Sequence, residues 1–198
     1  NRKNADDTAS YSDAMKFFVI VSWLIFLGMM FYLDVLKWLI RSDYWEGLRV
    51  VPVVLISYLF QGVFFNLSLW YKLTDKTEYG AYFSILGCII TVAINVLFVP
   101  VYGYMACAWA AFFCYLIMML VSYYYGQKNM PIRYDLKSIG FYTLIALILY
   151  GLSYISLGYE WLNYVYKTFL LGIFVMIMLQ RDMKGLIPEI VAKLKKSK

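Results

Sequence analysis

The sequence contains no histidine among its 198 residues. Acid–base, nucleophilic and metal chemistry that depends on an imidazole is therefore excluded for this chain. Charged residues are also scarce, at 15%, while 63% of the residues are hydrophobic. A soluble domain is typically about a quarter charged and about half apolar. The shortage of charge therefore argues against a soluble protein, and it leaves few residues for enzyme chemistry.

Cysteine and proline are also rare, with three and four copies. Cys88, Cys107 and Cys114 lie in apolar stretches without metal-ligand spacing, so we predict no metal, no other cofactor and no disulfide. We expect these cysteines to act as small residues at helix contacts. Pro52 falls in a first helical turn and Pro100 at a segment end, so proline is not expected to break any helix.

Six long apolar stretches account for most of the chain. A helix of about 20 residues crosses a bilayer, and in lipid a helix satisfies its own backbone hydrogen bonds. The composition therefore predicts an all-α, polytopic membrane protein with six transmembrane helices. The stretches are approximately 17–36, 50–71, 81–99, 104–125, 139–157 and 163–180.

Basic residues are distributed unevenly between the two predicted sides of the membrane. With the N-terminus in the cytoplasm, the cytoplasmic segments carry 14 of them and the other side carries 4. This bias predicts that both termini are cytoplasmic, because Lys and Arg concentrate in cytoplasmic loops. We expect membrane lipids as partners and no nucleic acid, because the basic residues sit at helix ends rather than on one soluble face.

These boundaries divide the chain into five parts. We predict a cytoplasmic lead-in over 1–16, four helices over 17–125, a cytoplasmic loop over 126–138, a helix pair over 139–180 and a basic cytoplasmic tail over 181–198. Ser12 or Asp13 could cap the first helix. The tail reads equally as a solvated segment or as an amphipathic helix on an anionic membrane surface. The polar start at Asn1 suggests the distal part of a longer protein.

Polar residues form stripes on the second and third predicted helices. Ser57, Gln61 and Ser68 share one helical face, and Ser84, Cys88, Thr91 and Asn95 share another. A hydrated cavity between the two helices is one interpretation, and hydrogen bonding between or within helices is the other. The interpretations are balanced for Gln61, Asn66 and Asn95. For the serines and Thr91 we favour bonds to their own backbone.

Two further patterns concern packing and charge. Ala106, Ala110 and Cys114 recur every four residues, as do Gly103, Cys107 and Ala111, and such rows of small residues let membrane helices approach closely. We therefore expect the fourth helix to be central. Asp34 and Lys37 are three residues apart and are expected to form a local ion pair rather than a proton relay.

Two stretches, residues 50–82 and 95–128, carry a recognisable pattern. It consists of Asn95 near the end of one helix, Pro100 at the boundary, the sequence GYMACAW over 103–109 and the pair Lys76–Thr77 in a loop. The chain resembles the polysaccharide transporter branch of the multidrug/oligosaccharidyl-lipid/polysaccharide exporter superfamily, in particular O-antigen-type flippases. The resemblance covers most of residues 10–130.

The resemblance implies a fourteen-helix, two-lobe transporter of the bacterial inner membrane, of which this chain would supply helices nine to fourteen. The missing N-terminal helices would then be its partners. The implied substrate is a polyprenyl-diphosphate-linked oligosaccharide, flipped by alternating access without covalent chemistry. Gln61, Asn66 and Asn95 would face the cavity between the lobes. Because no Lys or Arg lies mid-membrane, either Arg49 or Lys72 at a helix end would contact a phosphate, or the contacting cation would lie outside this chain.

Other functions stay open on the sequence. A small-molecule or drug exporter of the same superfamily would share these features. An independent six-helix assembly protein would share the hydropathy pattern alone. An intramembrane enzyme is disfavoured, because the chain lacks histidine, paired intramembrane carboxylates and a metal cluster.

Overall fold

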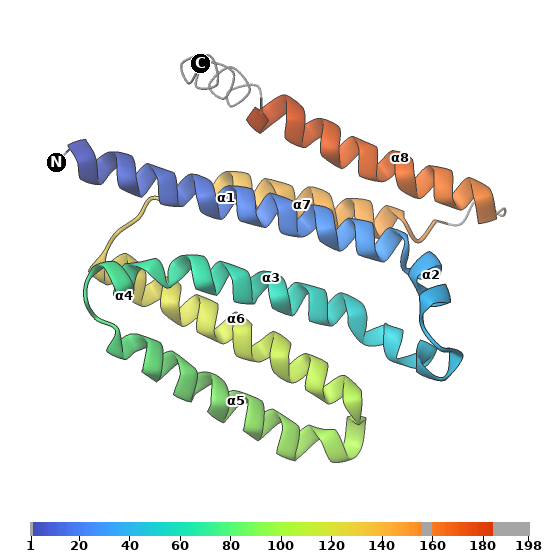
Figure 1. Ribbon diagram of the computed structural model, residues 1–198, viewed down its shortest axis with the longest axis horizontal. Helices are drawn as coiled ribbons and strands as arrows, with labels where there is room; N and C mark the ends of the chain where they lie inside the picture. The colour runs from blue at the N-terminus through green and yellow to red at the C-terminus, as the bar shows by residue number, and fades with distance from the viewer. Residues whose placement is uncertain (1, 156–159, 184–198) are drawn as a thin grey trace.

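The computed structural model describes residues 2–155 and 160–183, and every regular element within these ranges is a helix (Figure 1). The fold is thus all-α, as the sequence predicts. In chain order the elements are α1 (Arg2–Phe31), α2 (Leu33–Leu36), η1 (Lys37–Leu39), η2 (Ser42–Val50), α3 (Val51–Leu67), α4 (Leu69–Leu73), α5 (Glu78–Tyr102), α6 (Tyr104–Asn129), α7 (Leu136–Leu152), α8 (Glu160–Met178) and η3 (Leu179–Met183).

Five helical stretches of the described chain are long and apolar enough to cross a membrane. They are Ser10–Phe31, Ser42–Leu73, Glu78–Tyr102, Tyr104–Asn129 and Trp161–Asp182. The remaining apolar helix, α7, has 17 residues and replaces the longer span predicted over 139–157. At about 1.5 Å per residue it is about 25 Å long, near the lower limit for a spanning helix. Its crossing of the membrane stays a prediction.

The long helices run alternately in opposite directions (Figure 1). The described parts of the segments predicted to be cytoplasmic therefore lie at one end, which we call the basic end (residues 10–16, 72–77, 126–138 and 179–183). Hydrogen bonds join these segments: Lys76 Nζ donates to Asn129 Oδ1 at 2.6 Å, and the Asp135 N–H donates to Ser12 Oγ at 3.2 Å. The opposite end comprises residues 32–50, 102–104 and 152–155. The arrangement of the helices is thus consistent with the predicted placement of most basic residues on one side of the membrane.

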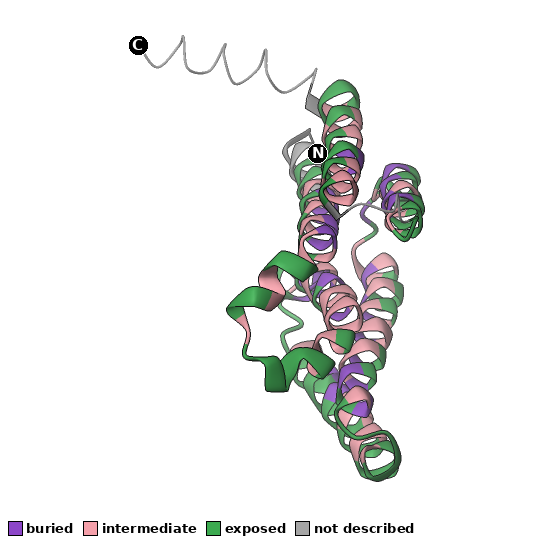
Figure 2. Cartoon of the chain, turned by 90° about the vertical axis from the view of Figure 1, so that its right-hand side faces the viewer, coloured by how far each residue is buried: buried purple, intermediate pink, exposed green. Residues whose placement is uncertain are grey.

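Two buried clusters hold the helices together. The first joins α1, α7 and α8 to the middle of α3, with Leu27, Tyr142 and Phe174 among its fully buried members. The second joins the end of α3, α4, α5 and α6 around Trp70 and Phe83. Helix α3 packs along α6, and α6 packs along α5. Figure 2 shows exposed residues along the outer faces of the helices. They include many large apolar side chains, most of all on α5, as suits helices that face lipid or further protein.

Helix α6 is central to the second cluster, and one row of small residues explains its position. The predicted row of Ala106, Ala110 and Cys114 is buried. It continues at the same four-residue spacing through Met118, Ser122 and Gly126, which are also buried. The second predicted row does not pack in this way: Cys107 is exposed, and Gly103 instead forms the turn between α5 and α6 at a φ of 56°, which favours glycine.

Gly126 gives a direct test of this close packing. A methyl group there would lie 2.9 Å from Trp70 Cδ1, and Trp70 is fully buried with its Nε1 donating to Ser122 Oγ at 3.3 Å. We expect Gly126→Ala to lower the free energy of unfolding in detergent by about 1–3 kcal/mol. The matched variant is Gly140→Ala, because a methyl group at Gly140 meets nothing within 4 Å. Equal stability of the two variants would contradict the packing.

Several predicted boundaries are corrected at the basic end. Residues 2–16 belong to α1 rather than to a separate lead-in, so neither Ser12 nor Asp13 caps a helix. No glycine or proline interrupts residues 1–16, and Ser12 is instead used as an acceptor from the α6–α7 connection. The loop predicted over 126–138 is shorter, because α6 continues to Asn129 and α7 begins at Leu136. Of the tail predicted over 181–198, residues 184–198 lie outside the described residues.

Other corrections concern single residues within the helices. Pro100 lies inside α5, which ends at Tyr102, so this proline does not terminate the helix. Helices α3 and α4 are separated only at Ser68, whose hydroxyl donates to the Phe65 carbonyl at 2.6 Å. Cys114 is a buried helix-contact residue as predicted, whereas Cys88 and Cys107 are exposed.

Candidate functional site

The predicted cavity residues lie on α3 and α5, both of which pack against α6. Asn66 Nδ2 donates to the Gly62 carbonyl of its own helix at 3.0 Å. Ser57 and Ser84 likewise bond to their own backbone, as expected for serines. No hydrogen bond joins the two polar stripes within the described chain, and Gln61 lines none of the three pockets described below. A shared cavity between the stripes stays a prediction.

Asn95 differs from the other predicted polar residues. Its Oδ1 atom is buried and has no hydrogen-bond partner among the described residues. The side chain lies on α5, two turns before the helix ends at Tyr102. An unsatisfied acceptor in this setting costs about 1–3 kcal/mol. Atoms of this chain already cover Asn95 Oδ1, and Asn95 lines none of the three pockets described below, so a ligand could reach this oxygen only after the surrounding helices move.

The two cations predicted to contact a phosphate are far apart. Arg49 is exposed in η2 at the opposite end, and Lys72 is exposed in α4 at the basic end. The 22 intervening residues are almost entirely helical, which separates the two side chains by about 35 Å. The structure therefore does not bring Arg49 and Lys72 together, and a single phosphate could contact only one of them.

A polar cluster at the basic end joins α1, α7 and η3, which directly follows α8. Lys16 Nζ lies 2.9 Å from Asp182 Oδ1, and both side chains are largely buried, at 16% and 9% exposure. The Tyr142 hydroxyl donates to the same carboxylate. Arg181 lies over the Phe141 ring, 4.2 Å from its centroid. These contacts fix the two last helices to α1.

Asp135 caps α7 beside this cluster. Its Oδ1 accepts from the Ser138 backbone N–H at 3.1 Å. Hydrogen bonds from the Ser138 hydroxyl and N–H, with the nearby charges of Lys16 and Arg181, hold the pKa of the Asp135 carboxyl below its usual 3.8. Because the folded pKa is the lower one, the stabilisation is complete above pH 3.8 and disappears as the pH falls through the folded pKa.

We therefore expect Asp135→Ala to cost about 1 kcal/mol of unfolding free energy at pH 7, since it removes an N-cap. Asp135→Ser should retain most of that stability, because a serine hydroxyl can accept the same bond. As the pH falls below 3.8, the difference in stability between the native chain and Asp135→Asn should shrink. Denaturation of the three variants in detergent at several pH values measures this, and a constant difference down to pH 3 would contradict the role of the charge.

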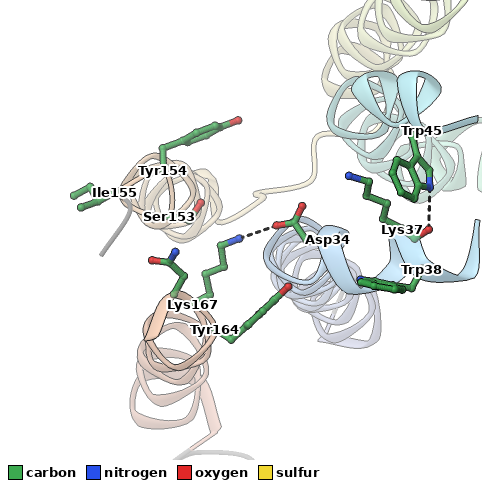
Figure 3. A pocket seen from close by; sticks show the side chains of 10 residues that line it. Asp34, Lys37, Trp38, Trp45, Ser153, Tyr154, Ile155, Tyr164 and Lys167 are labelled. Atoms are coloured by element: carbon green, nitrogen blue, oxygen red, sulfur yellow. Dashed lines mark hydrogen bonds and ion pairs between the residues drawn. The ribbon is translucent and has the colours of Figure 1, made fainter. Parts of the chain in front are cut away.

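At the opposite end, Asp34 does not form the predicted pair with Lys37. Its Oδ2 lies 3.5 Å from Lys167 Nζ on α8 (Figure 3), and nearby Tyr32 and Thr168 share a hydrogen bond of 2.8 Å. Lys37 Nζ instead lies 4.0 Å from the centroid of the Trp45 ring. The prediction was wrong because the chain leaves the α1 axis after Phe31, which places Asp34 next to the start of α8.

Three pockets accompany these clusters. One of about 580 Å³ lies at the opposite end between α2, η1 and η2 on one side and α7 and α8 on the other. A second, of about 330 Å³, lies between α5 and α6 near Phe98 and Trp109 and is lined by apolar and aromatic side chains. A third, of about 320 Å³, is a mainly apolar groove between α1, α3, α6 and α7 near Leu67.

Sequence reasoning missed Lys16, Asp182 and Lys167 as interacting residues. Each is a single charged residue at or near the edge of an apolar stretch. An unpaired charge in this setting costs free energy, so such a residue is expected to have a partner. The position of a charge at the edge of an apolar stretch therefore predicts that the residue is paired. It does not identify the partner, which here lies more than 100 residues away in the chain.

Comparison with protein-family models, with curated proteins and with solved structures found no match to this chain. The class of the protein therefore comes from its own architecture. It is an all-helical protein whose long apolar helices suit it to be embedded in a membrane.

Proposed function

We propose that this chain is the distal helical part of a bacterial inner-membrane transporter that flips a polyprenyl-diphosphate-linked oligosaccharide. The basic end would face the cytoplasm, together with both termini. The upstream helices implied by the resemblance would form the other wall of the transport pathway. Flipping needs a change of access around a central site and no covalent step, so the chain would not be an enzyme.

The arrangement of the helices supports this proposal in two ways. Alternation of the long helices gathers the basic segments at one end, as the positive-inside rule requires of a multi-pass protein. The exposed apolar face of α5 leaves a surface on which further helices could pack. An assembly protein would share both features, so neither of them selects transport.

Asn95 is the observation that carries the proposal. A buried, unpartnered amide oxygen inside an apolar helix is costly and needs a specific partner. Oligosaccharide hydroxyls are hydrogen-bond donors that could satisfy it during transport. The same residue belongs to the Asn95–Pro100 pattern on which the family resemblance rests.

Genetic complementation tests the proposal. The complete gene containing this sequence would be expressed in a strain that lacks its own lipid-linked oligosaccharide flippase, with a panel of substrate pathways. Restored surface polysaccharide with at least one pathway is the expected result. Failure with every pathway, with the protein present in the membrane, would count against flipping. Increased drug resistance in the same strain would favour the small-molecule exporter.

A further inference from the structure

The largest of the three pockets combines open aromatic faces with charged groups. Its volume of about 580 Å³ falls within the usual range of small-molecule sites, about 300–1,000 Å³. Trp38 and Tyr154 line it with 88% and 73% of their surface exposed. Asp34 and Lys167 lie between these aromatic walls (Figure 3). The other two pockets have no charged residue in their lining.

Contacts around the pocket hold one of its walls in place. Trp45 Nε1 donates to the carbonyl oxygens of Lys37 and Ile40, at 3.2 and 3.0 Å. The Lys37 ammonium lies over the ring of the same tryptophan. On the other side, the Asp34–Lys167 ion pair connects α2 to α8. A ligand would therefore meet a wall that is already ordered, which lowers the entropy cost of binding.

This lining matches the chemistry of a sugar. A pyranose ring presents apolar C–H faces, which pack on aromatic rings, and hydroxyls, which both donate and accept hydrogen bonds. Trp38 and Tyr154 supply rings, while Asp34 supplies an acceptor and Lys167 a donor. A lipid phosphate would find one uncompensated cation here, because Asp34 neutralises the nearby Lys167 and leaves Lys37, whose ammonium lies over the Trp45 ring.

We propose that this pocket binds a glycan of one or two sugar rings on the outer side of the membrane. The inference rests on the proposed function, which makes an oligosaccharide the cargo and this end of the helices the outer end. The pocket would hold the glycan after it has crossed and before it is released. The competing occupant is a phospholipid headgroup, because tryptophan and tyrosine commonly lie at headgroup level.

Binding can be measured on the purified product of the complete gene, the same protein that is used for complementation, in phosphatidylcholine nanodiscs. Saturation-transfer NMR would be recorded with N-acetylglucosamine, galactose, glucuronic acid and their disaccharides. We expect saturable transfer to at least one of them, and Trp38→Ala should weaken it about tenfold. Trp161→Ala is the matched control, because Trp161 is also exposed, at 66%, and does not line the pocket. This variant should bind within about twofold of the native chain.

Two results would overturn the proposal: absence of saturable transfer to every sugar, or an equal loss of binding in both tryptophan variants. A change in tryptophan fluorescence that phosphatidylglycerol causes and sugars do not, and that Trp38→Ala abolishes, would identify the site as a headgroup site instead. The outcomes of the complementation experiment and of the binding experiment can be distinguished. Sugar binding without complementation would reject flipping and leave the site, whereas complementation without sugar binding would reject the site alone.

Discussion

Replacing Lys16 with methionine is expected to lower the free energy of unfolding by about 3 kcal/mol, because the change leaves the Asp182 carboxylate buried without its cation. Lys16 Nζ and Asp182 Oδ1 lie 2.9 Å apart, and their contact joins α1 to η3, which directly follows α8. Tyr142 donates to the same carboxylate, so the loss should also loosen α7. Denaturant titration in mixed micelles would measure the change.

Lys72→Met is the control for this variant. Lys72 is exposed and takes part in none of the ion pairs of the described chain, so its loss should cost less than about 1 kcal/mol. Adding Asp182→Asn to Lys16→Met should recover part of the stability, because the unpaired charge is removed while a partner for Tyr142 remains. A Lys16→Met chain as stable as the Lys72→Met chain would show that the cluster does not fix these helices.

Replacing Asn95 with leucine is expected to reduce transport about tenfold or more while leaving the protein no less stable. The replacement removes a buried acceptor that has no partner, so unfolding free energy should rise by about 1 kcal/mol. Transport should fall because the substrate would lose a hydrogen-bond partner in the cavity. Surface polysaccharide in the complementation strain and unfolding of the purified variant would be measured together.

Val96→Leu controls for the added bulk at the neighbouring position, where the side chain is 68% exposed. This variant should transport normally. Normal transport by Asn95→Leu would remove Asn95 from the site. Loss of transport together with a large loss of stability would assign Asn95 a structural partner in place of a substrate.

The sequence was sufficient for the approximate positions of the long apolar helices, because hydropathy and helix length act locally. One packing feature could also be predicted locally. The four-residue repeat of small side chains that starts at Ala106 marks the face of α6 that neighbouring helices contact. Ser57 and Ser84 also behave as predicted, because their hydrogen bonds stay within one turn of their own helix.

Contacts between residues far apart in the chain could not be predicted from local sequence patterns. Asp34 had a plausible partner three residues away, yet it pairs with Lys167 because the chain bends after α1. Residues 2–16 look like a polar lead-in, yet they continue α1, and Ser12 and Lys16 contact the connection before α7 and the end of α8. Both errors arise because the partners lie more than 100 residues away, where periodicity carries no information.

The sidedness of the membrane helices is best tested by cysteine labelling. The three native cysteines would be replaced by alanine, and single cysteines introduced at Asp43, Lys128 and Tyr154, all of them exposed. An impermeant maleimide applied to intact spheroplasts should label Asp43→Cys and Tyr154→Cys, and should label Lys128→Cys only after permeabilisation. Labelling of Lys128→Cys and Tyr154→Cys from the same side would show that α7 does not cross the membrane. The reverse pattern would contradict the cytoplasmic placement of the basic end.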